Sequence, residues 1–330
     1  MKVLVTGADG LLGSNLVREL LERDYEVRGF IEVGKENGTL TGLKIEKFYG
    51  DLLNKENVNE AVKDIDVIIH AAANTSVSPA RSEMVLRVNI EGTRNVVNAC
   101  VGSKIRRFIF VGSANSFGYG SRENPGSENT PANSQKYKFD YMDSKREAQD
   151  LVLEAIKRQD LPGIIVNPTL MFGKYDSVPG TGKIILGVYN KIMPGYTSGG
   201  NNYIYVKDVA VGIVNAINKG QIGHCYIFGN ENLTFKEFFD KIASTIGCEA
   251  PKYKVPDIIV MTIGLLNSFI GTITGKAPTL SYRIAILSCD GRYYSAEKAR
   301  NELQLPDTPV EVAIQEAFQY FKDNGMVVEQ

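Results

Sequence analysis

The stretch Thr6-Gly7-Ala8-Asp9-Gly10-Leu11-Leu12-Gly13 follows an apolar strand, Lys2 to Thr6, and opens a helix expected over Gly13 to Glu22. Gly7 permits a tight turn, Gly10 lets the backbone approach a pyrophosphate, and Gly13 lets the helix pack close to the strand. The helix N-terminus would offer unpaired N–H groups to the phosphates. The stretch therefore predicts a dinucleotide-binding β-α-β unit; a tight turn without a ligand is the alternative. The candidate cofactor contacts here are Gly7, Asp9, Gly10, Leu11, Leu12 and Gly13.

Strands and helices alternate through the first 170 residues, and the strands are apolar at nearly every position. Further strands are expected at Val27 to Ile31, Lys44 to Tyr49, Asp66 to His70, Arg107 to Val111 and Gly163 to Val166, and helices at Asn57 to Lys63, Asn89 to Val101 and Asp140 to Arg158. Continuous apolar strands are typical of a parallel sheet buried on both faces. We therefore expect an α/β fold with a doubly wound parallel sheet (Rossmann), comprising a dinucleotide-binding domain at 1–170 and a smaller, mainly substrate-binding domain at 171–330. Later segments near 200–230 are candidates to complete the sheet.

Composition excludes several classes of protein. The chain has 330 residues, 43% of them hydrophobic and 23% charged, with a net charge of -1. No basic face is evident, so we expect no nucleic-acid partner. Four scattered cysteines and two histidines argue against a metal site and fit a reducing compartment. The N-terminus does not resemble a signal peptide, and we expect a cytoplasmic protein.

One later stretch, Ile258 to Ile273, is largely apolar but contains interspersed threonine, serine, asparagine and glycine. It is shorter than the roughly 20 residues that a spanning helix needs. We interpret it as a buried or lid-forming helix in preference to a membrane contact, and expect no membrane span.

Carboxylates follow the second and third strands. Glu32 can accept hydrogen bonds from the adenosine ribose hydroxyls and would repel a 2'-phosphate, which favours NAD over NADP, although Arg28 and Lys35 lie close in sequence. Asp51 could receive the adenine amino group or, alternatively, cap the following helix.

Tyr141-Met142-Asp143-Ser144-Lys145 places a tyrosine and a lysine four residues apart on one face of a predicted helix. A nearby ammonium lowers the pKa of a phenol and suits it to acid–base work. Ser113 ends the fifth strand, where ligands bind in this architecture, and its hydroxyl could polarise a substrate carbonyl. Ser113, Tyr141 and Lys145 are therefore the candidate catalytic residues, although each alone has an ordinary structural explanation.

The chain resembles the extended short-chain dehydrogenases/reductases, the NAD-dependent epimerase/dehydratase family. The matching segments are Thr6-Gly7-x-x-Gly10-x-x-Gly13, Gly50-Asp51-Leu52, His70-Ala71-Ala72-Ala73, Val88-Asn89-x-x-Gly92-Thr93-x-Asn95, Ser113, Tyr141-x-x-x-Lys145, Ile204-Tyr205-Val206-Lys207-Asp208-Val209-Ala210 and Ser295-x-x-Lys298-Ala299-x-x-Glu302-Leu303. The resemblance implies a homodimer, and it adds Leu52, Ala71, Ala72, Ala73, Asn89, Val111, Tyr141, Lys145, Asn167 and Pro168 to the cofactor site. It also implies that His70 is structural.

Within the family, the dihydroflavonol-4-reductase-like branch is the most similar. The support is Val166-Asn167-Pro168-Thr169-x-x-x-Gly173 and Gly223-x-x-Tyr226-x-x-Gly229-Asn230-Glu231-Asn232-Leu233-Thr234. Three departures matter. Ile164-Ile165-Val166-Asn167 differs from the segment usual in nucleotide-sugar epimerases, Glu32 stands where plant-type reductases carry arginine, and Val111-Gly112-Ser113 replaces the commoner Ser-Ser.

Three functions remain open. The first is an NAD(P)-dependent ketone or aldehyde reductase, or alcohol dehydrogenase, with a small carbonyl or alcohol substrate. The second is a sugar epimerase or dehydratase that retains NAD, and the third is a dinucleotide-sensing protein without chemistry. Specificity is expected from the region after Pro168, especially Tyr175 to Asn202, Ile258 to Ile273 and Tyr282 to Tyr294. These segments contain few charges, which favours an apolar or modestly polar substrate.

Overall fold

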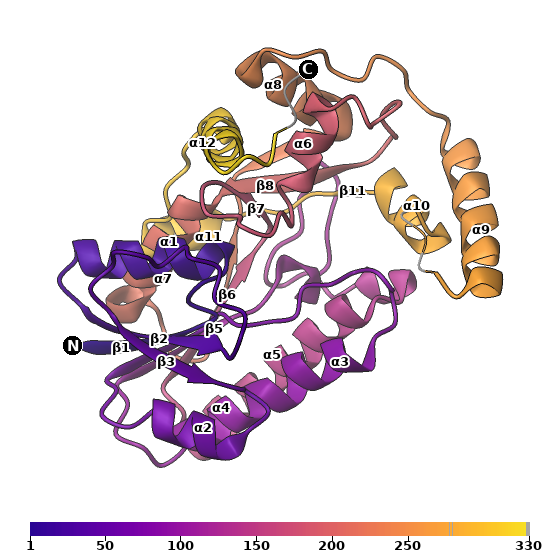
Figure 1. Cartoon of the computed structure of the whole chain (residues 1–330). Helices are drawn as coiled ribbons and strands as arrows, with labels where there is room; N and C mark the ends of the chain where they lie inside the picture. The colour runs from indigo at the N-terminus through magenta and orange to yellow at the C-terminus, as the bar shows by residue number, and fades with distance from the viewer. Residues whose placement is uncertain (277, 279, 328–330) are drawn as a thin grey trace.

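A computed structural model describes residues 1–276, 278 and 280–327. A seven-stranded parallel sheet forms its centre, in the order β3-β2-β1-β4-β5-β6-β9 (Figure 1). The strands are β1 (Lys2–Thr6), β2 (Glu26–Glu32), β3 (Glu46–Gly50), β4 (Val67–His70), β5 (Arg107–Val111), β6 (Gly163–Pro168) and β9 (Cys225–Phe228). The doubly wound sheet expected from the sequence is confirmed.

Helices cover both faces of this sheet, because each central strand sends alternate apolar side chains to opposite sides. Val3 and Val5 pack with α1 (Leu11–Glu22), α7 (Val206–Lys219) and α11 (Glu297–Leu303). Leu4 packs in a second core with α2 (Lys55–Ala61), α4 (Gly92–Cys100) and α5 (Asp140–Gln159). Two buried cores therefore hold the carboxyl ends of the strands in fixed positions.

Some element boundaries differ from the expectation. The helix expected from Asn89 begins earlier, as α3 (Glu83–Leu86), and reaches α4 through a π-helical turn, η1 (Arg87–Glu91). The strand expected to stop at Val166 continues to Pro168. Pairing with β5 ends at Val166, which lies opposite Val111, whereas pairing with β9 continues to Pro168, opposite Phe228. The late strand β9 therefore supplies the additional pairing, and it completes the sheet within the predicted region.

A smaller sheet lies beyond the first one. Its central strand β8 (Gly200–Tyr205) pairs with β7 (Leu170–Phe172), β10 (Glu231–Thr234) and β11 (Gly291–Arg292). A separate apolar core joins this sheet to α6 (Lys183–Tyr189), α8 (Phe235–Ile246) and α12 (Val310–Asp323). The second half of the chain thus contributes to both sheets, and a domain division at residue 170 stays a prediction.

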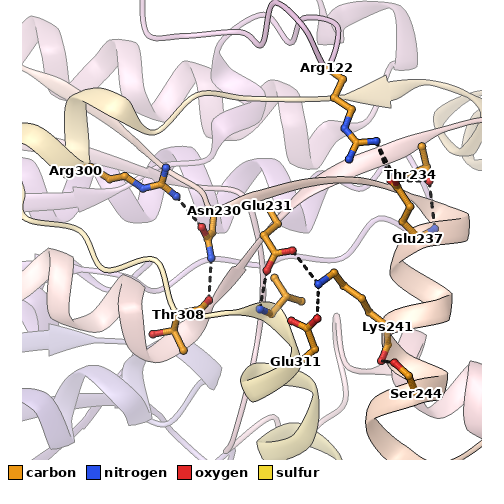
Figure 2. A network of polar contacts seen from close by, with 11 residues as sticks. Arg122, Asn230, Glu231, Thr234, Glu237, Lys241, Ser244, Arg300, Thr308 and Glu311 are labelled. Carbon is orange, nitrogen blue, oxygen red and sulfur yellow. Dashed lines mark hydrogen bonds and ion pairs between the residues drawn. The ribbon is translucent and has the colours of Figure 1, made fainter.

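A polar network fastens the second sheet to its helices (Figure 2). Glu231 of β10 accepts a hydrogen bond from the Val310 backbone N–H at 2.9 Å and pairs with Lys241 of α8 at 3.2 Å. Lys241 also pairs with Glu311 of α12. The network therefore holds β10, α8 and α12 together.

Helix α9 (Asp257–Thr274) and helix α10 (Tyr282–Cys289) pack against each other at the edge of the molecule (Figure 1). The 258–273 segment forms the expected helix, but its predicted burial is wrong, because only Val260 and Gly264 of α9 are buried. The lid-forming alternative stays a prediction. Length and composition alone would allow α9 to cross a membrane.

Candidate functional site

The glycine turn after β1 is a close contact between three backbone segments. Gly7 has a φ of +67°, and a Cβ there would lie 2.8 Å from the Cα of Ala72. A Cβ at Gly13 would lie 2.0 Å from the Gly7 carbonyl oxygen. At Gly10 a Cβ would lie 3.4 Å from the Gly7 carbonyl oxygen, an ordinary van der Waals contact, so packing within the chain does not require glycine here. Gly7 and Gly13 are therefore required by packing, whereas Gly10 leaves room for a ligand.

The N-terminus of α1 fits an anion. No side chain caps this helix, and Ser14 N–H, bonded to the Gly10 carbonyl at 2.8 Å, starts its backbone ladder. The N–H groups of Leu11, Leu12 and Gly13 precede that bond and point away from the helix. Donors and a positive dipole end suit a pyrophosphate, so this turn fits the phosphates of a dinucleotide.

Carboxylates surround the place where the adenosine ribose would lie. Glu32 is largely exposed at the end of β2 and pairs with Lys35 at 2.9 Å. Burial raises the pKa of Asp9, and the nearby charges of Glu36 and Glu32 raise it further. Arg28 is not available here, because its guanidinium donates to the Ala61 and Lys63 carbonyls. Glu32 and Glu36 are each paired with a lysine, Lys35 and Lys47, so the preference for NAD over NADP stays a prediction.

The turn after β3 is held by its own side chains. Asp51 Oδ1 accepts a hydrogen bond from Leu53 N–H at 2.9 Å, and Asn54, not Asp51, caps α2. The helix-cap alternative for Asp51 is therefore wrong, while its contact with adenine stays a prediction. Leu52 is buried, and its carbonyl accepts a bond from Asn95 at 2.9 Å.

His70 is fully enclosed by structural contacts. Its two ring nitrogens lie 2.8 Å from Thr6 Oγ1 and 3.0 Å from Thr93 Oγ1, and Thr6 Oγ1 also accepts from Ala72 N–H. Burial, with a smaller effect of Lys145, lowers the pKa of His70 to about 3. A neutral histidine thus fixes the loop that carries Ala71, Ala72 and Ala73, in agreement with its expected structural role.

Asn89 positions the same loop. Its Nδ2 donates to the Asn74 carbonyl and to Ser144 Oγ, and its Oδ1 accepts from Asn74 N–H at 2.8 Å. The side chain is buried and its polar atoms are taken up by the protein. Asn89 therefore links this loop to α5, and direct contact with a cofactor stays a prediction.

The three candidate catalytic residues meet at the carboxyl end of β5. Ser113 follows that strand and caps a 3₁₀ turn, η2 (Ala114–Ser116), while Tyr141 and Lys145 lie in the first two turns of α5. Burial raises the pKa of Tyr141, and its hydrogen bond with the Ser113 hydroxyl opposes that increase. The serine and the phenol are thus already paired.

Lys145 is buried and faces the same strand. Its Nζ donates to the Val111 carbonyl at 2.5 Å and lies 4.8 Å from the centre of the Phe110 ring. Burial lowers the pKa of Lys145 to about 7. The expected lowering of the Tyr141 pKa by Lys145 is not found in this structure. Burial disfavours the charged form of Lys145, and burial is also the largest influence on the pKa of Tyr141.

Gln149 and Gly112 complete the site, although the sequence interpretation missed both. Asn167 Nδ2 donates to the Ser113 carbonyl at 3.1 Å and to Gln149 Oε1 at 2.6 Å. A Cβ at Gly112 would lie 2.4 Å from Asn167 Nδ2, so the Val-Gly-Ser departure makes room for this amide. The spacing of Tyr141, Lys145 and Gln149 along one helical face was the available signal. Pro168 follows Asn167 at the end of β6.

An apolar cluster lies beside Tyr141. Tyr137, Phe139 and Met142 form its buried centre, and Ala80, Tyr119, Tyr141, Ile284, Ile286 and Leu287 pack against them. Tyr137 also donates to Asp290 at 2.5 Å. The side chains packed next to the phenol are thus mostly apolar. Over the described residues, no three His, Cys, Asp or Glu side chains converge as a metal site would need.

Comparisons with known proteins agree with this geometry. The model of the "NAD dependent epimerase/dehydratase family" matches residues 3–229. A Synechocystis sp. protein named "Putative dihydroflavonol 4-reductase" is 31% identical over 99% of this chain and 96% of its own. "Sterol demethylase protein B" of Methylococcus capsulatus is 28% identical over 99% of this chain and 100% of its own. The crystal structure of gox2253 superposes with a TM-score of 0.88 at 30% identity, covering 99% of both chains.

Proposed function

The chain belongs to the NAD dependent epimerase/dehydratase family, and we propose that it is an alcohol dehydrogenase or ketone reductase for apolar substrates. As a member of that family it is an NAD(P)-dependent enzyme of the extended short-chain dehydrogenase/reductase type. One observation carries the proposal. Ser113, Tyr141 and Lys145 meet at the carboxyl ends of the parallel strands, where the glycine turn also lies.

Tyr141 is the proton donor or acceptor in this proposal. A phenol whose pKa is raised by burial holds its proton at neutral pH, and Ser113 already shares a hydrogen bond with it. When bound, the nicotinamide supplies or accepts the hydride. Ser113 polarises the substrate oxygen, and Tyr141 delivers a proton to that oxygen or removes it.

Lys145 and Asn167 position the catalytic groups and the cofactor in this proposal. Lys145 lies one helical turn from Tyr141, and a neighbouring anion or ribose hydroxyl would compete for its Nζ with the Val111 carbonyl. Asn167 fixes the backbone of Ser113. The residues that would hold the cofactor are those of the glycine turn, the 71–73 loop and the ends of β5 and β6.

We propose NAD as the preferred cofactor. Glu32, Glu36 and Asp9 bring three carboxyl groups near the expected ribose. Burial raises the pKa of Asp9 most, and the charges of Glu36 and Glu32 raise it further. A 2'-phosphate would add a charge of the same sign. Arg28, the stronger of the two opposing cations in the sequence, is bound elsewhere.

The apolar cluster supports an apolar alcohol or ketone as the substrate. Ile284, Ile286 and Leu287 line it from α10, and Tyr137 and Phe139 line it from the segment before α5. The names of the two relatives refer to a flavonoid and a sterol, both of which are polycyclic compounds with few charges. A nucleotide sugar would bring phosphates into this surface.

The decisive experiment incubates the protein with NAD or NADP and a panel of polycyclic alcohols and ketones. We expect net reduction of NAD with an alcohol, or net oxidation of NADH with a ketone. The absorbance of NADH measures either change. Conversion of a nucleotide sugar without net change of cofactor would refute the proposal in favour of an epimerase. Cofactor binding without turnover of any panel member would favour the dinucleotide-sensing alternative.

A further inference from the structure

Helix α9 exposes a continuous apolar surface. The side chains of eight isoleucine, leucine and phenylalanine residues are between 43% and 70% exposed: Ile258, Ile259, Ile263, Leu265, Leu266, Phe269, Ile270 and Ile273. Large exposed apolar patches mark surfaces that meet a partner. The patch therefore requires a covering environment that the rest of the described chain does not supply.

Only one side of α9 is used within the molecule. Gly264 lies against Ala285 of α10, and a Cβ there would approach the Ala285 Cβ to 2.8 Å. Ser268 Oγ accepts from Tyr282 N–H at 2.8 Å, and Asn267 donates to the Leu280 carbonyl at 3.3 Å. Gly264, Asn267 and Ser268 of α9 thus face α10, and the large apolar residues face outward.

Two exposed threonine hydroxyl groups of α9 find their hydrogen-bond acceptors within the helix itself. Thr262 Oγ1 donates to the Ile258 carbonyl at 2.7 Å, and Thr272 Oγ1 donates to the Ser268 carbonyl at 3.0 Å. A hydroxyl that bonds its own helix can enter an apolar phase at low cost. The outer face of α9 is therefore compatible with hydrocarbon along its length.

The charges that border this surface are mostly basic. Lys252, Lys254, Lys276 and Arg283 flank α9, and no acidic residue occurs between Ile258 and Cys289. Two acidic side chains lie at the N-terminal side of α9: Glu249 is 3.8 Å from Lys252, and Asp257 accepts a hydrogen bond from Ser198 Oγ at 2.5 Å. Tyr253, which is 75% exposed, lies among the lysines. An apolar face bordered by basic and aromatic residues is typical of helices that lie in a lipid interface.

We propose that α9 docks flat on an anionic lipid bilayer, with its apolar face in the acyl boundary and the flanking lysines at the headgroups. A crossing is not compatible with the fold. The 18 residues of α9 are followed by α10, whose 8 residues are too few to return through a core of about 30 Å. The chain is back in the second sheet at Gly291.

Docking would also bring the bilayer near the candidate active site. Ile284, Ile286 and Leu287 of α10 pack against the apolar cluster beside Tyr141. The binding itself does not depend on the proposed chemistry, so a flotation assay tests it without any substrate.

The test is flotation of the full chain with phosphatidylcholine vesicles, with or without phosphatidylglycerol. We expect flotation with the anionic vesicles and clearly less with the neutral ones. The variant Leu266→Glu/Phe269→Glu should weaken binding by more than about tenfold, because two charges would enter the apolar boundary. The variant Lys252→Gln/Lys254→Gln should weaken binding to anionic vesicles by about fivefold for each lysine removed.

A matched control is Val178→Glu/Ile222→Glu, which alters two side chains that are 77% and 56% exposed in the segments before α6 and before β9. This control should float like the wild type, and all variants should keep the wild-type melting temperature. Failure of the wild type to float with anionic vesicles would overturn the proposal. A second result would also overturn it: the wild type does not float, and light scattering gives a lower molecular mass for Leu266→Glu/Phe269→Glu than for the wild type. That result would assign the apolar face to contact with a second copy of the chain.

Discussion

The central strands and helix α9 are both strongly apolar, yet the fold treats them in opposite ways. Val67, Ile68 and Ile69 of β4 are completely buried between two layers of helices. In α9, Leu265, Leu266 and Phe269 are each more than half exposed. The strands are covered because β-α units repeat on both sides of them, whereas α9 has α10 on one side only. Hydropathy therefore indicates which residues avoid water, but the surrounding topology decides what covers them.

The largest expected effect concerns the buried site. Tyr141→Phe removes the proton that the proposal requires, so turnover should fall about a thousandfold, within the range of general acid–base catalysis. Initial rates of nicotinamide reduction with a polycyclic alcohol would measure the loss. Tyr253→Phe, which alters an exposed tyrosine, is the control and should keep full activity. Retention of activity by Tyr141→Phe would remove the catalytic assignment.

The second prediction tests the two apolar regions directly. Ile69→Ala in β4 should lower the free energy of unfolding by about 2–5 kcal/mol, because it leaves a cavity in a closed core. Ile270→Ala in α9 should change it by less than about 0.5 kcal/mol, because this side chain is 54% exposed. Urea denaturation of both variants measures the difference. Equal losses would mean that α9 is covered in solution.

The third prediction concerns the carboxylates at the end of β2. Glu32→Ser removes one negative charge near the expected ribose, so the ratio of kcat/KM for NADP to that for NAD should rise about tenfold. Glu26→Ser, at the exposed start of the same strand, is the control and should leave the ratio unchanged. An unchanged ratio in Glu32→Ser would place the ribose away from Glu32.

The smallest effect is a pH dependence of stability that the buried lysine produces. The pKa of Lys145 is about 7 in the folded chain, below the value of about 10.4 expected for an unfolded chain. Between these values only the unfolded state binds the proton, so the free energy of unfolding should rise with pH, by at most about 1.4 kcal/mol per unit.

Lys145→Met should flatten that rise when unfolding is measured between neutral and mildly alkaline pH. Lys157→Met alters an exposed lysine on the same helix and should keep it. His70 does not interfere, because its depressed pKa affects stability only at acidic pH. A rise that persists in Lys145→Met would assign it to another group.

Local patterns were sufficient for the glycine turn and for the doubly wound parallel type of the sheet. Gly7, Gly10 and Gly13 follow a strand directly, and a backbone requirement of this kind acts within a few residues. The Tyr141 and Lys145 spacing likewise fixed a common helical face. The alternation of apolar segments predicted a doubly wound sheet, because strands buried on both faces have a distinctive composition.

Distance along the chain explains what the sequence left undecided. The role of Gly112 depends on the amide of Asn167, which comes from a different strand. Asn89 is tied to Asn74 and Ser144, which hold it away from free solvent. Arg28 lies close to Glu32 in sequence, but four residues of extended strand separate the two positions by about 13 Å. The Arg28 guanidinium reaches the Ala61 and Lys63 carbonyls instead.

By itself the sequence determined the family, the sheet and the three residues Ser113, Tyr141 and Lys145, because each of these depends on local geometry or on a linear motif. Only the tertiary structure decided that burial governs the pKa values of Tyr141 and Lys145, since burial is set by distant segments. It likewise decided that α9 presents its apolar face outward, because composition fixes how apolar a helix is and packing fixes which side remains uncovered.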